Sequence, residues 1–307
     1  MKNHNKNEKN HHSYKHVHEV SDLSGKKIFW VTVLNAAITS AEFIGGILSG
    51  SLSLLSDSVH NLSDTLAIML SYIAHRISHR PKNSKKTFGY KRAEIIAAFI
   101  NASVLFAISF MLIIEAFKRF ANPEPISGNL MMIVAIIGLI ANLLSVLLLQ
   151  KDSHSNMNIK SSYLHLLSDT VSSVGVVIGG IMISLFDIYW IDPVITLLIS
   201  VYILYNTFKI IRDSINILMQ ASPDVDYHII KEDIESISEI VNIHHVHAWM
   251  LDEKSIFFEA HLELINMPLD EVEKIIQKVE TILKKKYGFT HTTLQPEIDK
   301  CENKELF

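Results

Sequence analysis

The motif H-x-L-S-D-T occurs twice in the chain, and each copy places a histidine four residues before an aspartate. On a helix, residues four apart lie on the same face, so each copy presents an imidazole nitrogen and a carboxylate oxygen in one direction. Two copies facing each other supply four ligands whose two negative charges balance a divalent cation, as in a tetrahedral zinc site. The candidate ligands are His60, Asp64, His165 and Asp169.

Both pairs lie in apolar stretches, where a hydrogen-bonded pair inside a helix bundle is the alternative explanation. In a membrane, an ionisable residue near the bilayer centre costs at least ~2.5 to 3.5 kcal/mol and usually marks a pathway or a site. Two matching pairs therefore favour a metal or proton site. Glu42 and Asp57 also lie inside apolar stretches that have no central Lys or Arg, so this interior suits a cation.

Six stretches are apolar, nearly free of Lys and Arg, and close to the ~20 residues that cross a bilayer. They are residues 28–50, 52–74, 93–117, 130–149, 161–186 and 191–211. The chain has 307 residues, of which 49% are hydrophobic and 20% charged, so the charge is concentrated outside these stretches. We therefore expect an α-helical membrane protein with six transmembrane helices.

The basic residues between the predicted spans indicate the orientation of the chain. The connection after the second span carries Arg76, Arg80, Lys82, Lys85, Lys86, Lys91 and Arg92. The connection between the fifth and sixth spans, from Asp187 to Asp192, has no Lys or Arg. By the positive-inside rule the first connection is cytoplasmic, and six spans then place both termini in the cytoplasm.

The two ends of the chain differ in character. Residues 1–24 are polar and cannot bury a core, so we interpret them as a disordered cytoplasmic tail, with weak metal capture or plain disorder as alternative roles. The histidines of this tail are His4, His11, His12, His16 and His18. Residues 25–211 form the predicted membrane domain, and residues 212–307 a cytoplasmic domain with regulatory metal binding.

The pattern of residues 212–307 predicts a small α+β domain. A helix is expected from Asp226 to Ile240, and two strands at 244–250 and 255–264. A second helix begins near Pro268 and ends before Gly288, and a last strand runs over 289–295. The order αββαβ is that of a compact ferredoxin-like or metallochaperone-like domain.

Histidines gather in the predicted strands of this domain, with Glu297 just beyond the last strand. They are His244, His245, His247, His261 and His291. Any one of them is most simply a surface or hydrogen-bonded residue, but as a group they favour a cytoplasmic zinc site. Because Cys301 is the single cysteine, we expect every metal to be held by histidine and carboxylate.

These motifs resemble the cation diffusion facilitator family, whose members export zinc and related divalent ions, from about Gly25 to Glu297. The resemblance is carried by Ser56–Asp64, Phe88–Glu94, His165 with Asp169, His244–Trp249, Ala260–Leu262 and His291–Glu297. It implies a transport site formed by His60, Asp64, His165 and Asp169. It implies a cytoplasmic zinc site formed by His244, His261, His291 and Glu297. It also implies a homodimer that exchanges zinc for protons, with cadmium and cobalt as further candidate ions.

The chain departs from the family pattern at several positions. His245 stands where the motif usually has aspartate, and Pro296 interrupts the last predicted strand. Between the fourth and fifth spans the sequence has only His154 in place of a long histidine-rich run, which favours a bacterial inner-membrane protein. His75 and His79 lie in the loop where some members hold a further zinc site.

Zinc needs neutral imidazoles and ionised carboxylates, so protonation releases it, and alternating access then gives zinc–proton antiport without enzymatic chemistry. A membrane metalloenzyme is one alternative, but the chain lacks H-E-x-x-H, and four protein ligands leave no position for a catalytic water. A membrane-anchored zinc sensor is another, which explains the cytoplasmic histidines but not the paired membrane ligands. No basic patch suggests nucleic acid.

Overall fold

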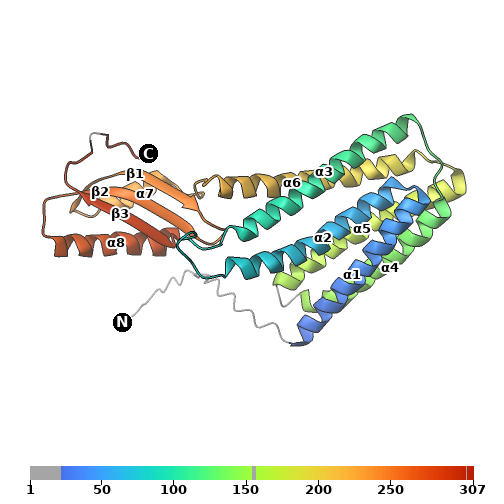
Figure 1. The fold of residues 1–307 in the computed structure, drawn as a ribbon, viewed down its shortest axis with the longest axis horizontal. Coiled ribbons are helices and arrows are strands. Elements are labelled where there is room, and N and C mark those ends of the chain that lie inside the picture. The colour runs from blue at the N-terminus through green and yellow to red at the C-terminus, as the bar shows by residue number, and fades with distance from the viewer. Residues whose placement is uncertain (1–21, 154–156, 302) are drawn as a thin grey trace, which may run out of the picture.

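The structure is a computed structural model that describes residues 22–153, 157–301 and 303–307, so the predicted N-terminal tail lies almost wholly outside it. Six long helices lie side by side at one end of the molecule, and a small α+β domain forms the other end (Figure 1). The helices are α1 (Asp22–Ser49), α2 (Leu52–Ser78), α3 (Ala93–Ala121), α4 (Gly128–Ser153), α5 (Met157–Phe186) and α6 (Ile191–Leu218).

Among the described residues, four of these helices have the length and apolarity of a membrane span. They are the helices at Ala93–Ala121, Gly128–Leu147, Leu166–Phe186 and Ile191–Leu218. The helix α2 carries Asp57, His60 and Asp64 together with several serines, which lowers its hydropathy. The helical membrane fold is confirmed, and the number of six spans stays a prediction.

The helices pack as neighbours that are not always consecutive in the chain. The helix α3 lies along α6, α4 along α5, and α1 against both α2 and α4 (Figure 1). At Gly180 on α5, a Cβ atom would come within 3.0 Å of the Met132 backbone on α4, so glycine permits this close approach. At Gly138, a Cβ atom would collide with the Glu42 carboxylate of α1. Glycine thus permits close packing of helices at these two positions.

The first turn of α2 is fixed by Asp192, a fully buried residue at the start of α6. Its carboxylate accepts hydrogen bonds from the hydroxyls of Ser51 and Ser53, both at 2.6 Å. It also accepts from the backbone N–H groups of Leu52 at 2.8 Å and Ser53 at 3.1 Å. A carboxylate at a helix N-terminus satisfies free donors and complements the helix dipole, so α6 holds in place the helix that carries the first H-x-L-S-D-T motif.

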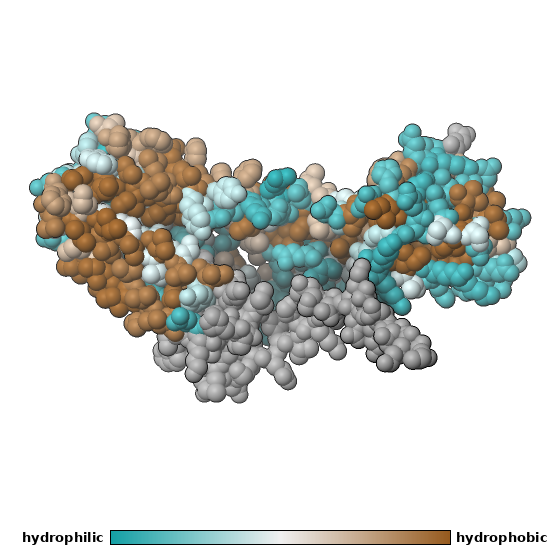
Figure 2. All heavy atoms as spheres, turned by 180° about the vertical axis from the view of Figure 1, so that it is seen from behind, coloured by the Kyte–Doolittle hydropathy of each residue, from teal (hydrophilic) through white to brown (hydrophobic). Residues whose placement is uncertain are grey.

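Large apolar side chains remain exposed along the six helices. Examples are Ile44, Ile114, Leu144 and Leu198, with exposed fractions of 56, 43, 50 and 69%. Figure 2 shows hydrophobic residues covering one end of the molecule, whereas hydrophilic residues cover much of the end formed by the C-terminal domain. Exposed apolar surface of this extent is expected where lipid takes the place of water.

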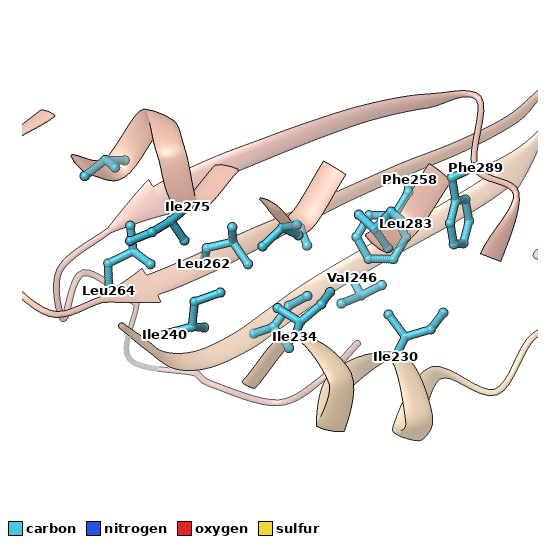
Figure 3. Packing of buried hydrophobic residues seen from close by; sticks show 14 residues of the cluster. Ile230, Ile234, Ile240, Val246, Phe258, Leu262, Leu264, Ile275, Leu283 and Phe289 are labelled. Carbon is cyan, nitrogen blue, oxygen red and sulfur yellow. The ribbon is translucent and has the colours of Figure 1, made fainter. Parts of the chain in front are cut away.

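The C-terminal domain has the predicted order αββαβ. Its elements are α7 (Tyr227–Glu235), β1 (Ile240–Met250), β2 (Ile256–Leu264), α8 (Leu269–Tyr287) and β3 (His291–Glu297). The sheet order is β1-β2-β3, with β1 antiparallel and β3 parallel to β2. Both helices cover one core, in which Ile230 of α7, Phe258 of β2 and Leu283 of α8 are buried (Figure 3).

Two boundaries in this domain differ from the prediction. The helix predicted to end at Ile240 ends at Glu235, and Ile240 is the first residue of β1. The apolar residues near Ile240 belong to the strand and not to the helix. The expectation that Pro296 interrupts the last strand is wrong, since β3 pairs with β2 through to Glu297. β3 is an edge strand of the sheet, and such a strand tolerates a proline whose missing N–H faces away from its partner.

The basic connection between α2 and α3 contacts the C-terminal domain. Lys91 Nζ lies 4.0 Å from Asp252 Oδ2 in the β1–β2 turn. The rings of Phe88 and Phe257 meet edge to face, with their centroids 5.4 Å apart. The connection with the most positive charge therefore lies on the same side of the helices as the C-terminal domain.

Candidate metal sites

The two H-x-L-S-D-T motifs face each other across the contact between α2 and α5. His60 Nε2 on α2 lies 3.6 Å from Asp64 Oδ2 one turn further along, and 3.5 Å from Asp169 Oδ1 on α5. Asp169 is buried, with a side chain only 4% exposed. An imidazole nitrogen and two carboxylate oxygens therefore converge at one place, as the helical spacing predicts.

The fourth predicted ligand, His165, lies on α5, one turn before Asp169. Its backbone is part of the described helix, but its side chain lies outside the described residues. From the sequence alone, positions 165 and 169 are four residues apart and share one face of a helix. His165 therefore stays a sequence-based ligand of the proposed site.

A cavity of about 380 Å³ opens beside these ligands. His60 and Asp64 line it from α2, Asn101 from α3 and Asn206 from α6. The lining follows the halves of α2, α3 and α6 that lie nearest the C-terminal domain (Figure 1). The cavity thus extends from the ligands towards the end of the helices nearest this domain.

Buried polar residues surround the helix turn that carries His60. Asp57 on α2 accepts hydrogen bonds from the hydroxyls of Ser172 at 2.7 Å and Ser173 at 3.2 Å on α5. Asn61 on α2 donates to Glu42 Oε2 on α1 at 3.2 Å. Buried polar networks fix the relative position of the helices that they join. These bonds therefore hold α1, α2 and α5 in register around the ligands.

A second cluster lies in the C-terminal domain, where neighbouring strands bring residues together. His244 on β1 pairs directly with His261 on β2, and Glu297 ends β3 beside them. His244 Nε2 lies 3.1 Å from Glu297 Oε1, and His261 Nδ1 lies 3.3 Å from Glu297 Oε2. The thiol of Cys301 joins this group, at 3.4 Å from His261 Nδ1.

The electrostatics of this second cluster favour the protonation states that a metal requires. Partial burial lowers the pKa of His261, and the neighbouring His245 and His244 lower it further. Burial would raise the pKa of Glu297, but the hydrogen bond from Cys301 and the nearby imidazoles hold it below its ordinary value. A neutral imidazole and an ionised carboxylate are the metal-binding forms of these groups.

The other predicted histidines of this domain lie outside the cluster. His291 pairs with Phe257 at the opposite end of β3 from Glu297, and its ring packs 4.7 Å from the Phe257 ring. His245 and His247 are exposed beside the cluster. The structure therefore brings together three of the four ligands predicted for this domain and leaves His291 apart.

Sequence reasoning missed Cys301, because a single cysteine excludes a cysteine-rich module and was set aside as a ligand. The structure places its thiol in a cluster that was predicted to contain histidine and carboxylate alone. Its distance of four residues from Glu297 was the available signal. That spacing indicates proximity only if the chain turns back after β3, which the pattern of apolar residues does not reveal.

A third group lies at the surface, where His75 and His79 end α2 and Glu94 begins α3. His75 Nδ1 lies 3.1 Å from Glu94 Oε1, and the two histidine rings have centroids 4.2 Å apart. All three residues are exposed. The geometry of this group is compatible with a metal ion. Because exposed side chains can move apart, we do not assign a metal site here.

A bundle of apolar helices that encloses imidazole and carboxylate side chains, joined to a small α+β domain, defines a helical membrane protein built to handle cations. Comparison with known families is specific: residues 28–219 match the cation efflux transmembrane domain. Residues 222–299 match the cytoplasmic domain of cation efflux proteins. The chain belongs to the cation efflux family, and the resemblance to the cation diffusion facilitators is confirmed.

Bacterial relatives align along most of the chain. It is 34% identical over 293 residues to the zinc transporter ZitB of Shigella flexneri, and this alignment covers 94% of this chain and 93% of that protein. It is 36% identical over 287 residues to the cadmium, cobalt and zinc/H(+)-K(+) antiporter of Bacillus subtilis, covering 92% of each. The metal cation efflux system protein CzcD of Cupriavidus metallidurans is 33% identical to it over 288 residues, which are 94% of this chain and 91% of that protein.

Proposed function

We propose that this chain exports zinc from the bacterial cytoplasm in exchange for protons, and that it does so without enzymatic chemistry. The observation that carries the proposal is the convergence of His60, Asp64 and Asp169 from two helices at one end of a cavity. His165 completes the proposed transport site by its position on α5. Two imidazoles and two carboxylates suit zinc in charge, donor type and number.

The chemistry of the ligands couples zinc to protons. Zinc binds neutral imidazole and ionised carboxylate, so a site that faces the cytoplasm loads zinc as its protons leave. When the same site faces outward, arriving protons compete for His60, Asp64 and Asp169 and discharge the metal. Helix rearrangement that exposes the site alternately to each side then gives antiport.

The cavity indicates which side the site faces in this conformation. It follows the halves of the helices nearest the C-terminal domain, and the basic connection after α2 lies against that same domain. With positive residues on the cytoplasmic side, the cavity is a cytoplasmic approach to the metal ligands. Both termini are then cytoplasmic in a multi-pass protein of the inner membrane.

The named relatives support zinc as the main substrate, with cadmium and cobalt as further ions. A zinc sensor without transport accounts less well for the membrane site, because a sensor needs no ligands beside a cavity between helices. A metalloenzyme needs an open coordination position for water, which a site of four protein ligands does not leave.

The proposed division of the chain is a membrane domain at 25–211 and a cytoplasmic domain at 212–307 that also mediates a homodimer. The helix α6 continues to Leu218, so its last turns project from the membrane towards α7. In the cytoplasmic domain, a regulatory zinc binds at His244, His261 and Glu297. A metal that prefers one arrangement of the dimer shifts the population towards it.

The function is tested by zinc flux in proteoliposomes that contain the full chain and an internal zinc indicator. With the cytoplasmic face outward, we expect an acidic lumen to drive zinc inward, because protons leaving the lumen are exchanged for zinc. Collapsing the pH gradient with an ionophore is expected to stop accumulation. Zinc binding without flux would favour the sensor, and flux indifferent to the pH gradient would exclude antiport.

The cytoplasmic site is tested by equilibrium zinc binding to the full chain in detergent, in an Asp169→Asn background that disables the transport site. We expect Glu297→Gln in this background to weaken the remaining binding by at least about 100-fold, because a direct ligand loses its charge while the side chain keeps its shape, and loss of an outer-shell partner alone costs about 10- to 100-fold. The matched control is His291→Gln, which lies at the other end of β3 and should leave binding unchanged. The reverse ranking of the two variants would contradict this ligand set.

A further inference from the structure

The thiol of Cys301 lies within reach of both carboxylate and imidazole ligands of the proposed cytoplasmic site. Its Sγ atom is 3.4 Å from His261 Nδ1 and 3.5 Å from Glu297 Oε2. One ligand atom from each of these residues and from His244 can be chosen so that all lie within 4.8 Å of one another. Atoms that bind zinc at about 2.0 to 2.3 Å in a tetrahedron are ~3.3 to 3.7 Å apart, so the group needs only small shifts to enclose an ion.

Two buried atoms in this group point independently to a ligand. His244 Nε2 and Glu297 Oε1 lie 3.1 Å apart, yet neither makes a hydrogen bond within the described part of the chain. Their side chains are 0% and 3% exposed. Buried polar atoms that make no hydrogen bond are costly, and a metal ion held between them would satisfy both.

The second nitrogen of His244 faces an acceptor that suits one tautomer of the ring. Its Nδ1 lies 3.2 Å from Asn242 Oδ1, so the tautomer with its proton on Nδ1 donates to this oxygen. In that tautomer, Nε2 keeps a lone pair for a metal and lies 3.1 Å from Glu297 Oε1. A histidine ligand whose other nitrogen donates to an oxygen is the usual arrangement in zinc sites.

The backbone after β3 turns so that Cys301 faces the cluster. Asp299 adopts a left-handed conformation with φ 44°, which bends the chain shortly after Glu297. The side chain of Lys304 then bonds to Glu263 on β2 at 2.8 Å and to Asp299 at 2.9 Å. Cys301 thus lies between a left-handed residue, Asp299, and an ion-paired lysine, Lys304.

Beyond Cys301, the C-terminal segment 303–307 lies along β1 at an irregular point of the strand. His245 has a φ of 52°, and the pairing of β1 with β2 shifts register between His244 and His247. The backbone N–H groups of His245 and Val246 donate to the carbonyl oxygens of Glu305 at 3.2 Å and Leu306 at 2.7 Å.

The last residue of the segment packs on α7. The ring of Phe307 meets the ring of Tyr227 edge to face, with centroids 5.4 Å apart. The C-terminal end of the chain therefore closes over the β1 strand and touches the first helix of the domain. Two backbone hydrogen bonds, the ion pair of Lys304 with Glu263 and the packing of Leu306 and Phe307 hold the segment in place. A metal bond at Cys301 would add a further attachment near the start of the segment.

We propose that the Cys301 thiolate is the fourth ligand of a closed zinc site with His244, His261 and Glu297, and that zinc binding fastens the segment 303–307 to β1. The inference rests on the proposed cytoplasmic site and extends it. Binding forms a zinc–sulfur bond and transfers the thiol proton to solvent, so no oxidant or reductant is needed. Four protein ligands that include a thiolate suit zinc or cadmium and disfavour magnesium and manganese.

The test uses the fact that Cys301 is the single cysteine of the chain. Full-length protein in detergent is alkylated with iodoacetamide, with and without zinc, and the modified fraction is followed by intact mass. We expect zinc to slow alkylation at least about tenfold, because a metal-bound thiolate is a poor nucleophile. Glu297→Gln should largely remove this protection, whereas Asp169→Asn, which affects only the transport site, should retain it.

Two results would overturn the ligand assignment. One is an alkylation rate that zinc leaves unchanged in a protein that still transports zinc, a result that leaves the proposed function standing. The other is equal protection in wild type and Glu297→Gln. Cobalt provides a second readout, because wild type should show a thiolate-to-cobalt charge-transfer band that Cys301→Ser lacks, and a band of equal strength in both would exclude the bond.

The fastening of the C-terminal segment is measured separately with a serine carboxypeptidase, which needs no metal. Zinc should slow removal of Phe307 and Leu306 at least about threefold in wild type and have no effect on Cys301→Ser, because only wild type can link metal to the segment. Equal trimming of wild type with and without zinc would overturn the fastening.

Discussion

Replacing Asp169 by asparagine is expected to abolish zinc transport while leaving the chain folded. The substitution keeps the shape of the side chain but removes one of the two negative charges that balance the cation. Asp169 Oδ1 lies 3.5 Å from His60 Nε2, so its loss also changes the field at the neighbouring ligand. Loss of an outer-shell partner alone commonly costs about 10- to 100-fold in metal affinity, and we expect at least about 100-fold for a direct ligand.

The measurement is the initial rate of zinc accumulation in proteoliposomes under a fixed pH gradient. The initial rate should fall by the same factor in Asp64→Asn, because the two carboxylates bind one ion. The control is Asp187→Asn, an exposed carboxylate in the α5–α6 connection, which should transport normally. If Asp169→Asn accumulates zinc at the wild-type rate, with equal amounts of folded protein in the vesicles, the proposed transport site is wrong.

The convergence of His60, Asp64 and Asp169 could be predicted from the sequence, because on a helix the spacing of two residues decides whether they share a face. His60 and Asp64 share a face on any helix, and the repeat of the motif indicated the partner helix. The burial of Asp57 and Glu42 followed in the same way from their position in apolar stretches. Spacing alone could not predict contacts between helices without a repeated motif, such as that of Asp192 on α6 with the start of α2.

The cytoplasmic site was only partly predictable because strands depend on register. The pairing of His244 with His261, and of β3 with β2, decides which residues meet. This register places His291 opposite Phe257, six residues away from Glu297 along β3, a distance of roughly 20 Å at the usual rise of a strand. The contribution of Cys301 depended on a left-handed residue at Asp299, which no pattern of polarity encodes.

Exchanging His60 for aspartate is expected to relax the choice of metal at the transport site. The ring nitrogen of His60 lies between Asp64 and Asp169, at 3.6 and 3.5 Å from their oxygens, so it supplies a borderline donor at the centre of the described ligands. Aspartate there gives three carboxylates and one imidazole, a harder and more negative set. Both motifs begin with histidine, although an aspartate fits the same helical face.

Hard oxygen donors favour larger or harder ions, so His60→Asp should lose preference for zinc over cadmium and manganese by at least about tenfold, equivalent to ~1.4 kcal/mol in relative binding. The variant also places a third carboxylate one turn from the buried Asp57, so we expect a lower absolute rate for zinc. Competition uptake with the three metals, on wild type and variant, separates the two effects, since a general loss of rate leaves the order of preference intact. His60→Asn is the matched control, because it shortens the side chain without adding charge. An unchanged order in His60→Asp would mean that helix packing around the site, and not the donor at position 60, selects the metal.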